Sequence, residues 1–354
     1  MPIPTEPIGS IPRPPELIAA VTEFQEGRLA QDKLSALYTD ALRATIRRLE
    51  ATGSPVITDG EQTKPSFATY PIHGLKNLAP DGITVPFADG HVRRLPRLVS
   101  GPFRFKTYAA SFLETARQYT KTPLKQAVIS ASLLSLLYPQ EGIPGYSREQ
   151  FLSDLIGEAV KDIRECINKG AVKVQIDFTE ARLSLKLDPS GGVLEQFIGL
   201  NNRVLGQFSA AERLKIGVHT CPGGDQDATH SADVDYAGLL PSLFKLNAGN
   251  FYLQLASEKD RLHVLRLIRQ CSQADQKIFV GVIDPINPRI ETAEEVRDRV
   301  LEAAEFIPLE RLGTTDDCGF SPFGDDTSTA RETAFAKITA RIIGTKLAAQ
   351  KLGL

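Results

Sequence analysis

Short apolar runs alternate with longer stretches of helical period along most of the chain. The helical stretches carry start signals, among them the capping boxes Ser147–Gln150 and Thr292–Glu295. Eight of the apolar runs predict strands, at Pro7–Ser10, Val56–Glu61, Ala127–Ser130, Val172–Asp177, Ile216–Cys221, Phe251–Ala256, Ile278–Asp284 and Leu312–Cys318. Strands that alternate with helices indicate a parallel sheet with right-handed crossovers.

Eight strand–helix units favour an α/β fold of the closed TIM (β/α)8 barrel type over an open doubly wound sheet. An open nucleotide-binding sheet would carry a glycine-rich phosphate loop after its first strand. The segment Ile8–Pro14 has the wrong glycine spacing and too many prolines for such a loop. We therefore predict one barrel domain that spans residues 1–354.

Additions to this barrel are expected at three places. The stretch Leu75–Lys106 is rich in Gly and Pro and contains the turn-like Ala88–His91, which predicts a hairpin insertion after the second strand. The first forty residues and a last helix, from about Asp326 to Leu352, are expected to pack on the barrel exterior.

Polar side chains fall at the carboxyl ends of the predicted strands, which is the face where barrels build their active sites. They are Ser10, Asp59, Glu61, Ser130, Asp177, His219, Cys221, Gln254, Asp284, Asp316, Asp317 and Cys318. Polar ends on nearly every strand are not required for stability, so they indicate a single site on this rim.

The pair His219 and Cys221 is the most specific of these signals. Residues two apart in a strand point to the same face, so both side chains project together. A buried cysteine beside a hydrogen-bonded histidine is the ordinary alternative. If Cys318 joins them, the three form a His-Cys-Cys set suited to Zn²⁺ with one coordination position open.

Composition narrows the partners and the compartment. The chain has 354 residues, a formal net charge of −2 and 42% hydrophobic residues, which is ordinary for a soluble enzyme. This balance gives no electrostatic case for nucleic acid or for an anionic membrane. Four cysteines and no signal-peptide pattern predict a cytoplasmic protein with free thiols.

Six segments resemble the C-terminal catalytic barrel of cobalamin-independent methionine synthase, in family order. They are Ile8-Gly9-Ser10, Asp59-Gly60-Glu61, Gln175-Ile176-Asp177, His219-Thr220-Cys221, Asn287-Pro288-Arg289-Ile290 and Asp316-Asp317-Cys318-Gly319. The resemblance implies a TIM barrel with zinc held by His219, Cys221 and Cys318. It also implies that Ser10, Glu61 and Asp177 bind the amino-acid part of homocysteine.

The chain departs from the family pattern at three positions. Gln254 stands where the family has a further zinc-ligand carboxylate. Phe178 replaces a glutamate, although Glu180 is close by, and Ile286 replaces a histidine that the family uses as a proton carrier. The chain is thus similar to the short single-barrel relatives. Its predicted activity is zinc-dependent transfer of a methyl group to a small-molecule thiol such as homocysteine.

Two other functions stay open at this point: a zinc-dependent thiol transferase that opens epoxides, similar to coenzyme M transferases, and a non-catalytic zinc barrel. Candidates for carrying a proton to the leaving group are Asp284, His230 and Glu180. Arg182 and Arg289 are candidate anchors for an anionic group on either substrate. The expected partners are a thiol and a methyl or alkyl donor, and a homo-oligomer is left open.

Overall fold

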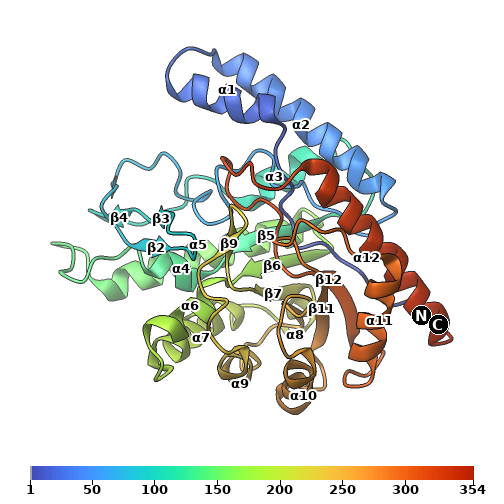
Figure 1. Cartoon of the computed structure of the whole chain (residues 1–354). Helices are drawn as coiled ribbons and strands as arrows, with labels where there is room; N and C mark the ends of the chain where they lie inside the picture. The colour runs from blue at the N-terminus through green and yellow to red at the C-terminus, as the bar shows by residue number, and fades with distance from the viewer. Residues whose placement is uncertain (1) are drawn as a thin grey trace.

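The computed structural model describes residues 2–354, and six parallel strands form the continuous part of its barrel wall (Figure 1). They lie in the order β12–β11–β10–β7–β6–β5, so sequence neighbours pair throughout. Their bounds are β5 (Lys125–Ile129), β6 (Lys173–Asp177), β7 (Ile216–Thr220), β10 (Asn250–Leu253), β11 (Lys277–Ile283) and β12 (Leu312–Asp316). All but the first residues of β6 and β11 are buried, as expected of parallel strands covered on both faces.

Two irregular segments close the ring between β12 and β5. Thr5 makes an isolated parallel bridge to Thr314 of β12, and Ile57 makes one to Leu124. The segments meet through the Ile11 amide, which donates to the Gly60 carbonyl oxygen at 3.0 Å. The barrel prediction is confirmed, but the first two predicted strands, Pro7–Ser10 and Val56–Glu61, are not regular strands.

The reason for this irregularity lies in the backbone. Pro4 and Pro7 lack the N–H group that a ladder needs. Gly60 and Glu61 have φ values of +64° and +55°, which no strand contains. Glu61 nevertheless lines a cavity on this face of the barrel.

Helices surround the strands in the expected alternation. The longer ones are α3 (Ala109–Arg117), α5 (Arg148–Asn168), α6 (Glu180–Leu187), α7 (Gly192–Leu205), α10 (Arg261–Cys271), α11 (Ala293–Ala304) and α12 (Arg331–Lys351). Short turns of helix connect them at α4 (Ala131–Ser135), α8 (Ala210–Arg213), η1 (Tyr236–Gly238) and α9 (Leu240–Leu243). Both predicted capping boxes are confirmed, at the starts of α5 and α11.

The predicted hairpin insertion is also confirmed. Strands β2 (Thr84–Pro86) and β3 (Val92–Arg94) pair antiparallel, and so do β1 (Leu78–Ala79) and β4 (Arg97–Leu98). A further small hairpin, β8 (Gly224–Asp225) with β9 (Ala228–Thr229), follows β7. The Ala88 amide donates to the Thr229 carbonyl oxygen at 2.9 Å, so the two hairpins contact each other.

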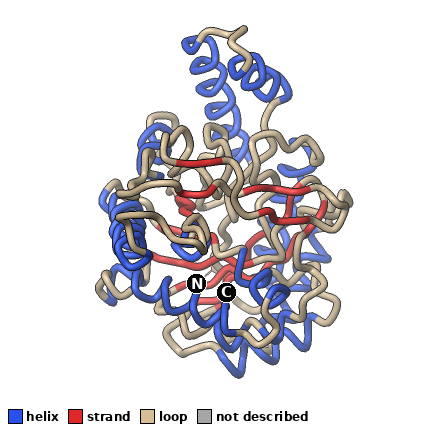
Figure 2. Tube along the Cα trace, turned by 90° about the vertical axis from the view of Figure 1, so that its left-hand side faces the viewer, coloured by secondary structure: helices blue, strands red, loops and turns tan. Residues whose placement is uncertain are grey.

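The N-terminal helices depart from the expectation. α1 (Pro15–Gln25) and the first part of α2 (Gln31–Ala51) project from the barrel as a helical pair, visible in both ribbon views (Figures 1 and 2). Leu17, Ala20, Leu34 and Ala41 form a separate buried cluster between them. Only the second half of α2 packs on the barrel, through residues such as Ile46 and Leu49.

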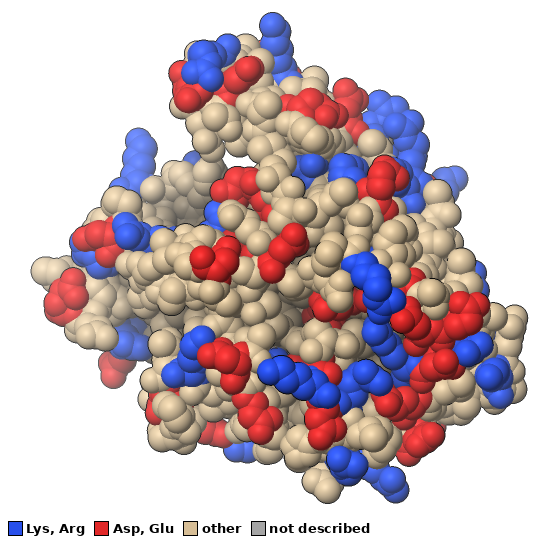
Figure 3. Space-filling view, viewed as in Figure 1, with Lys and Arg blue, Asp and Glu red and all other residues tan. Residues whose placement is uncertain are grey.

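On the face that Figure 3 shows, acidic and basic side chains are interspersed and form no large patch of one charge. Among residues 2–354, no helix combines the length and the apolar character needed to cross a membrane.

At the C-terminal end of the chain, the last helix, α12, starts at Arg331, a few residues later than predicted.

Candidate metal and thiol site

His219, Cys221 and Cys318 meet at the carboxyl ends of β7 and β12. Their ligand atoms all lie within 4.8 Å of one another, and all three side chains are buried. The two Sγ atoms are 3.0 Å apart with both thiols free. The period-two argument for His219 and Cys221 and the expected meeting with Cys318 thus agree with the geometry.

The neighbouring strand fixes the histidine ring. His219 Nδ1 lies 3.2 Å from the Tyr252 carbonyl oxygen, so it carries the proton and donates it there. His219 Nε2 is buried and has no hydrogen-bond partner among the described residues. A buried nitrogen lone pair beside two thiols is the donor set that Zn²⁺ takes in proteins.

The thiol pair supports the same conclusion electrostatically. A hydrogen bond from Cys221 lowers the pKa of Cys318, whereas burial raises the pKa of Cys221. The pair therefore favours a thiolate on Cys318 that accepts a hydrogen bond from the Cys221 thiol. A divalent cation would favour loss of that second proton, because thiolates rather than thiols bind metal. The residues present fit a zinc ion.

Two aspartates hold Cys318 in place. Asp317 accepts from the amides of Leu255, Ala256 and Ser257 at 2.7 to 2.9 Å, which ties the end of β10 to the end of β12. Asp316 accepts from the Arg341 guanidinium at 2.7 Å and from the Ile8 amide at 3.2 Å. The Asp-Asp-Cys segment thus builds the site by connecting three chain segments around one thiol.

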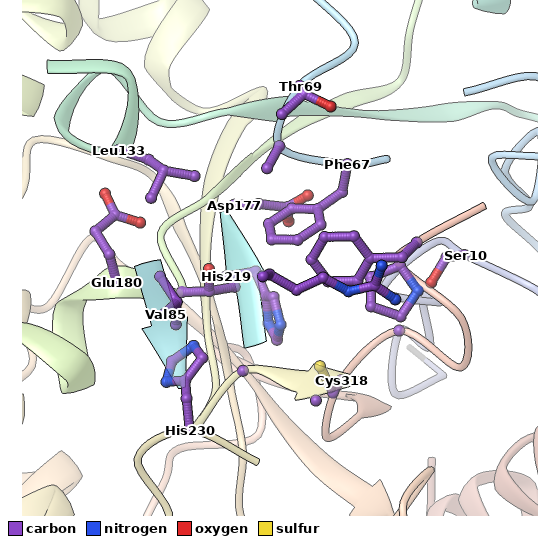
Figure 4. A pocket seen from close by; sticks show the side chains of 18 of the residues that line it. Ser10, Phe67, Thr69, Val85, Leu133, Asp177, Glu180, His219, His230 and Cys318 are labelled. Atoms are coloured by element: carbon purple, nitrogen blue, oxygen red, sulfur yellow. The ribbon is translucent and has the colours of Figure 1, made fainter. Parts of the chain in front are cut away.

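A narrow cavity of about 90 Å³ lies above the cluster (Figure 4). The structure brings Ser10, Glu61, Asp177, Glu180 and His230 into its lining together with His219 and Cys318. Figure 4 shows His219 between Asp177 and Cys318, with Glu180 and His230 on the side opposite Ser10. Asp177 is the register partner of His219 on β6, which explains its place directly beside the ring.

Two carboxyl groups in this cavity, those of Asp177 and Glu180, have pKa values near neutral pH. Burial raises the pKa of Asp177 to about 7, and the neighbouring Glu61 carboxylate adds to the shift. Burial raises the pKa of Glu180 to about 7 as well, while hydrogen bonds from Ser130 and Ser132 oppose that shift. Glu180 Oε1 accepts both hydroxyls, and Glu180 Oε2 has no partner in the described part of the chain. A carboxyl of this pKa can exchange a proton at physiological pH.

His230 is less suited to that role. Its ring lies against Gly223, and its Nδ1 is 2.9 Å from the Ser231 hydroxyl. Burial lowers the pKa of His230 to about 4, and the nearby charges of Lys186 and Arg182 add to the shift. The ring is therefore neutral at pH 7 and cannot donate a proton as an imidazolium there.

The other predicted residues are distributed differently. Gln254, Asp284 and Arg182 line a second cavity, of about 560 Å³, which also reaches Cys318. Burial raises the pKa of Asp284. Arg182 does not present a free guanidinium, since it donates to Glu258 at 2.7 Å and to the Val234 carbonyl oxygen.

Arg289, the other predicted anchor for a substrate anion, is paired with a carboxylate of its own chain. Its guanidinium is exposed and donates to both carboxylate oxygens of Glu295, at 2.8 and 2.9 Å. Neither of the two cavities includes Arg289 in its lining. Arg289 lies in the loop before α11, and its partner Glu295 completes the capping box of that helix.

Residues of the hairpin insertion line the first cavity and were not predicted from the sequence. Val85, Phe87, Arg93 and Leu95 form its outer wall. Arg93 donates to Asp225 at 2.5 Å and to Asp325 at 2.8 Å, so it fastens the hairpin to two loops of the rim. No periodic signal in the sequence indicates such a contact, because it joins loops distant along the chain.

Lys64 was also missed. It is buried, donates to Glu61 Oε1 at 3.0 Å and to the Ala127 carbonyl oxygen at 3.0 Å, and so orients the Glu61 carboxylate. Its position three residues after Glu61 was the available signal.

Comparison with known proteins identifies relatives of the whole chain. A family model described as the catalytic domain of cobalamin-independent synthase matches residues 3–337. The methionine synthase of Saccharolobus islandicus strain Y.G.57.14 is 24% identical over 352 residues, covering 99% of this chain and 96% of that protein. The 5-methyltetrahydropteroyltriglutamate–homocysteine methyltransferase of Nitratidesulfovibrio vulgaris is 24% identical over 321 residues, and the match spans only 38% of its length.

Solved structures with this fold include a B12-independent methionine synthase from Shewanella sp. W3-18-1 in complex with selenomethionine. It superposes with a TM-score of 0.78 at 23% identity and covers 99% of both chains. A putative vitamin-B12 independent methionine synthase from Listeria monocytogenes gives a TM-score of 0.68 at 22% identity and covers 97% of both chains. These neighbours agree with the barrel described above.

Proposed function

The chain belongs to the cobalamin-independent synthase catalytic-domain family, and on this premise we propose that it is a zinc-dependent methyltransferase that methylates a small thiol such as homocysteine. The observation that carries the proposal is the His219, Cys221 and Cys318 cluster at the junction of two cavities. Two cavities that meet at one metal-binding set suit a reaction between two substrates. A purely structural zinc site is normally closed by four protein ligands and needs neither cavity.

His219 Nε2 and the two Sγ atoms would hold the ion. When bound, Zn²⁺ lowers the pKa of a substrate thiol so that the nucleophilic thiolate forms at neutral pH. Cys221 and Cys318, as cysteinates, would offset the charge of such an ion, so that a substrate thiolate would keep enough electron density to attack carbon.

The other residues orient the thiol and protect it from water. Asp177 and Glu61 offer carboxylates to an ammonium group, and Ser10 offers a hydroxyl beside Gly319. The apolar wall from the hairpin excludes water above the thiol. Glu180, with its pKa of about 7, is the residue best placed to accept the thiol proton or to donate one to a leaving group.

An epoxide-opening thiol transferase is the second candidate, and Glu180 favours it. An opened epoxide leaves an alkoxide that must take up a proton, and Glu180 can supply one in the first cavity.

Metal content is the first test. Purified protein should hold about one zinc ion per chain, and Cys318→Ser should lose it because a serine hydroxyl is a poor zinc ligand at neutral pH. Cys271→Ser is the matched control, since Cys271 lies at the end of α10 away from the cluster. Equal zinc content in wild type and Cys318→Ser would contradict the ligand assignment.

Product analysis is the second test. The zinc protein is incubated with homocysteine and a methyl donor, or with coenzyme M and a small epoxide. Methionine as the product supports the methyltransferase, and a hydroxyalkyl thioether supports the alternative. If the zinc protein alkylates no thiol with any donor, the proposed function is wrong.

A further inference from the structure

The second cavity has a chemical character of its own. It is lined by the loops that follow β7, β10, β11 and β12 and has a volume of about 560 Å³, enough for a small molecule. Gly224 and Cys318 line both cavities, so this one opens onto the thiol cluster from another side. If the thiol substrate lies beside Asp177 in the first cavity, the second is free for the group that the thiol attacks.

Negative charge dominates this lining. Six carboxylates contribute to it: Asp233, Asp235, Glu258, Asp260, Asp284 and Asp317. The cationic side chains of the lining are Arg182 and Lys259, and Lys186, which lies outside the lining, pairs with Asp233 at 2.9 Å. Arg182 pairs with Glu258 at 2.7 Å, so these two charges offset each other. The carboxyl groups of the lining that form no ion pair within the described residues are Asp235, Asp260, Asp284 and Asp317, against Lys259 as the remaining cation. Burial raises the pKa of Asp284 and raises that of Asp317 to about 7, so the negative charge of the lining grows as pH rises through neutrality. An anionic ligand would meet net repulsion here, whereas a cation would be attracted.

Gln254 supplies an independent indication. Its Nε2 donates to Ser257 Oγ at 2.7 Å and to Glu258 Oε1 at 2.9 Å, which fixes the amide. Its Oε1 is buried and accepts no hydrogen bond from any described residue, and the side chain lines the cavity. An orphan carbonyl oxygen in a low-dielectric wall is costly unless a donor or a positive charge completes it.

An apolar contact lies on the cluster side of the cavity. A Cβ atom built on Gly224 would stand 2.8 Å from Ile286 Cδ1 and 3.7 Å from Cys318 Sγ. Ile286 therefore approaches the thiol cluster with a group that neither donates nor accepts a proton. Such a contact suits a methyl group.

We propose that this cavity binds a small cationic methyl donor, a sulfonium or a quaternary ammonium ion, with one methyl group directed at the substrate thiolate. The proposal rests on the proposed function. The thiolate forms a bond to the methyl carbon, and the bond from that carbon to the onium centre breaks. The electron pair goes to the leaving sulfur or nitrogen, so a neutral thioether or amine departs and no proton is needed.

Binding of trimethylsulfonium provides the test, because this ion carries no carboxylate or amine that could use the first cavity. We expect calorimetry on the zinc protein without thiol to detect its binding, weakened by added salt. Gln254→Leu and Asp233→Asn/Asp235→Asn should each weaken binding about tenfold, with zinc content unchanged. Asp32→Asn/Asp40→Asn, the same charge change on α2, should leave binding unaltered.

Turnover completes the test. With homocysteine, trimethylsulfonium should be a better donor by kcat/KM than the anionic 5-methyltetrahydrofolate, and KM for the cation should rise in both cavity variants. A preference for the folate, or a cation affinity that both cavity variants leave unchanged, overturns the proposal. Zinc content and homocysteine binding, measured separately, identify a failure of the proposed function itself, in which case the donor assignment fails with it.

Discussion

His219 can serve as a ligand because its neighbours decide which nitrogen is free. The Tyr252 carbonyl oxygen holds Nδ1, and Nε2 faces the two thiols without a partner in the described chain. Tyr252 and Asp177 are the register partners of His219 on the adjacent strands β10 and β6. One row across three strands thus supplies the ligand, the group that fixes its tautomer and a carboxylate beside it.

Substitution of Asp177 tests the division between metal and substrate contacts. Asp177→Asn removes a carboxylate that would bind a substrate ammonium group, and a hydrogen bond to a charged group is worth about 1.5–3 kcal/mol. We expect KM for homocysteine to rise roughly 10- to 100-fold while zinc content stays unchanged. A thiol without an amino group should be much less affected.

Asp284→Asn is the matched control, since Asp284 lines the other cavity. Steady-state kinetics and metal analysis on the same preparations provide the measurement. Loss of zinc from Asp177→Asn would show that Asp177 is a ligand.

Glu180 gives a pH prediction with a definite sign. Its pKa is about 7 in the folded protein and near 4.5 when unfolded. Below pH 4.5 the carboxyl is protonated in both states, and its contribution to stability is fully present. As pH rises to about 7, only the unfolded state ionises, so that contribution is lost. Glu180→Gln stays neutral and should gain on the order of 3 kcal/mol of relative stability across this window.

Urea unfolding of both proteins at a series of pH values, with zinc held constant, measures this difference. A difference in the free energy of unfolding that stays flat between pH 4.5 and 7.5 would rule out a buried, protonated Glu180.

The hairpin insertion is the element that turns an open rim into an enclosed cavity. It contributes apolar wall residues, and Arg93 fastens it to Asp225 of β8 and to Asp325. The Arg93 guanidinium also lies 4.2 Å from the centre of the Phe323 ring. How firmly the hairpin insertion is held over the first cavity therefore depends on the Arg93 guanidinium, which joins three loops.

Arg93→Ala should loosen this cover without unfolding the barrel. A bidentate, charge-assisted contact is lost, so we expect a chelator to remove zinc on the order of tenfold faster. The control is Arg97→Ala, which removes the exposed pair with Asp81 in the same insertion and should leave the rate unchanged. Equal rates for the two variants would show that the hairpin does not limit access to the metal.

The sequence predicted the elements that depend on local pattern and missed those that depend on loop contacts. The six regular strands were found because buried parallel strands are continuous apolar runs. His219 and Cys221 followed from the period of two. The place of Arg289, by contrast, is decided by how the loop before α11 turns, and the place of Arg93 by how a hairpin folds over the rim. Neither leaves a periodic trace.

At the scale of the whole molecule, the least regular part of the barrel wall lies between β12 and β5. The segments around Thr5 and Ile57 pair through isolated bridges instead of full ladders, so side chains must help to hold them. Lys125 of β5 donates to the Pro7 carbonyl oxygen at 2.8 Å and lies 3.6 Å from Glu6 Oε2. Tyr252 donates its hydroxyl to the same carboxylate at 2.5 Å from across the barrel. This buried network spans the interior and fixes the segment that leads to Ser10.

A double-mutant cycle measures what this network contributes. Burial lowers the pKa of Lys125 to about 7, so the cycle is measured at pH 6, where the ammonium is charged. At that pH, Lys125→Met leaves the Glu6 carboxylate buried without this cation, and breaking a buried pair costs on the order of 3–5 kcal/mol. Lys125→Met combined with Glu6→Gln removes both charges, so the double variant should recover much of that loss and the two effects should not add. Urea unfolding gives the four free energies. Lys245→Met, which breaks the exposed pair with Glu195, should cost about 1 kcal/mol or less. Additive effects at Lys125 and Glu6 would mean that backbone bridges alone hold the segments around Thr5 and Ile57 in the barrel wall. The position of Ser10 would then not depend on these buried charges.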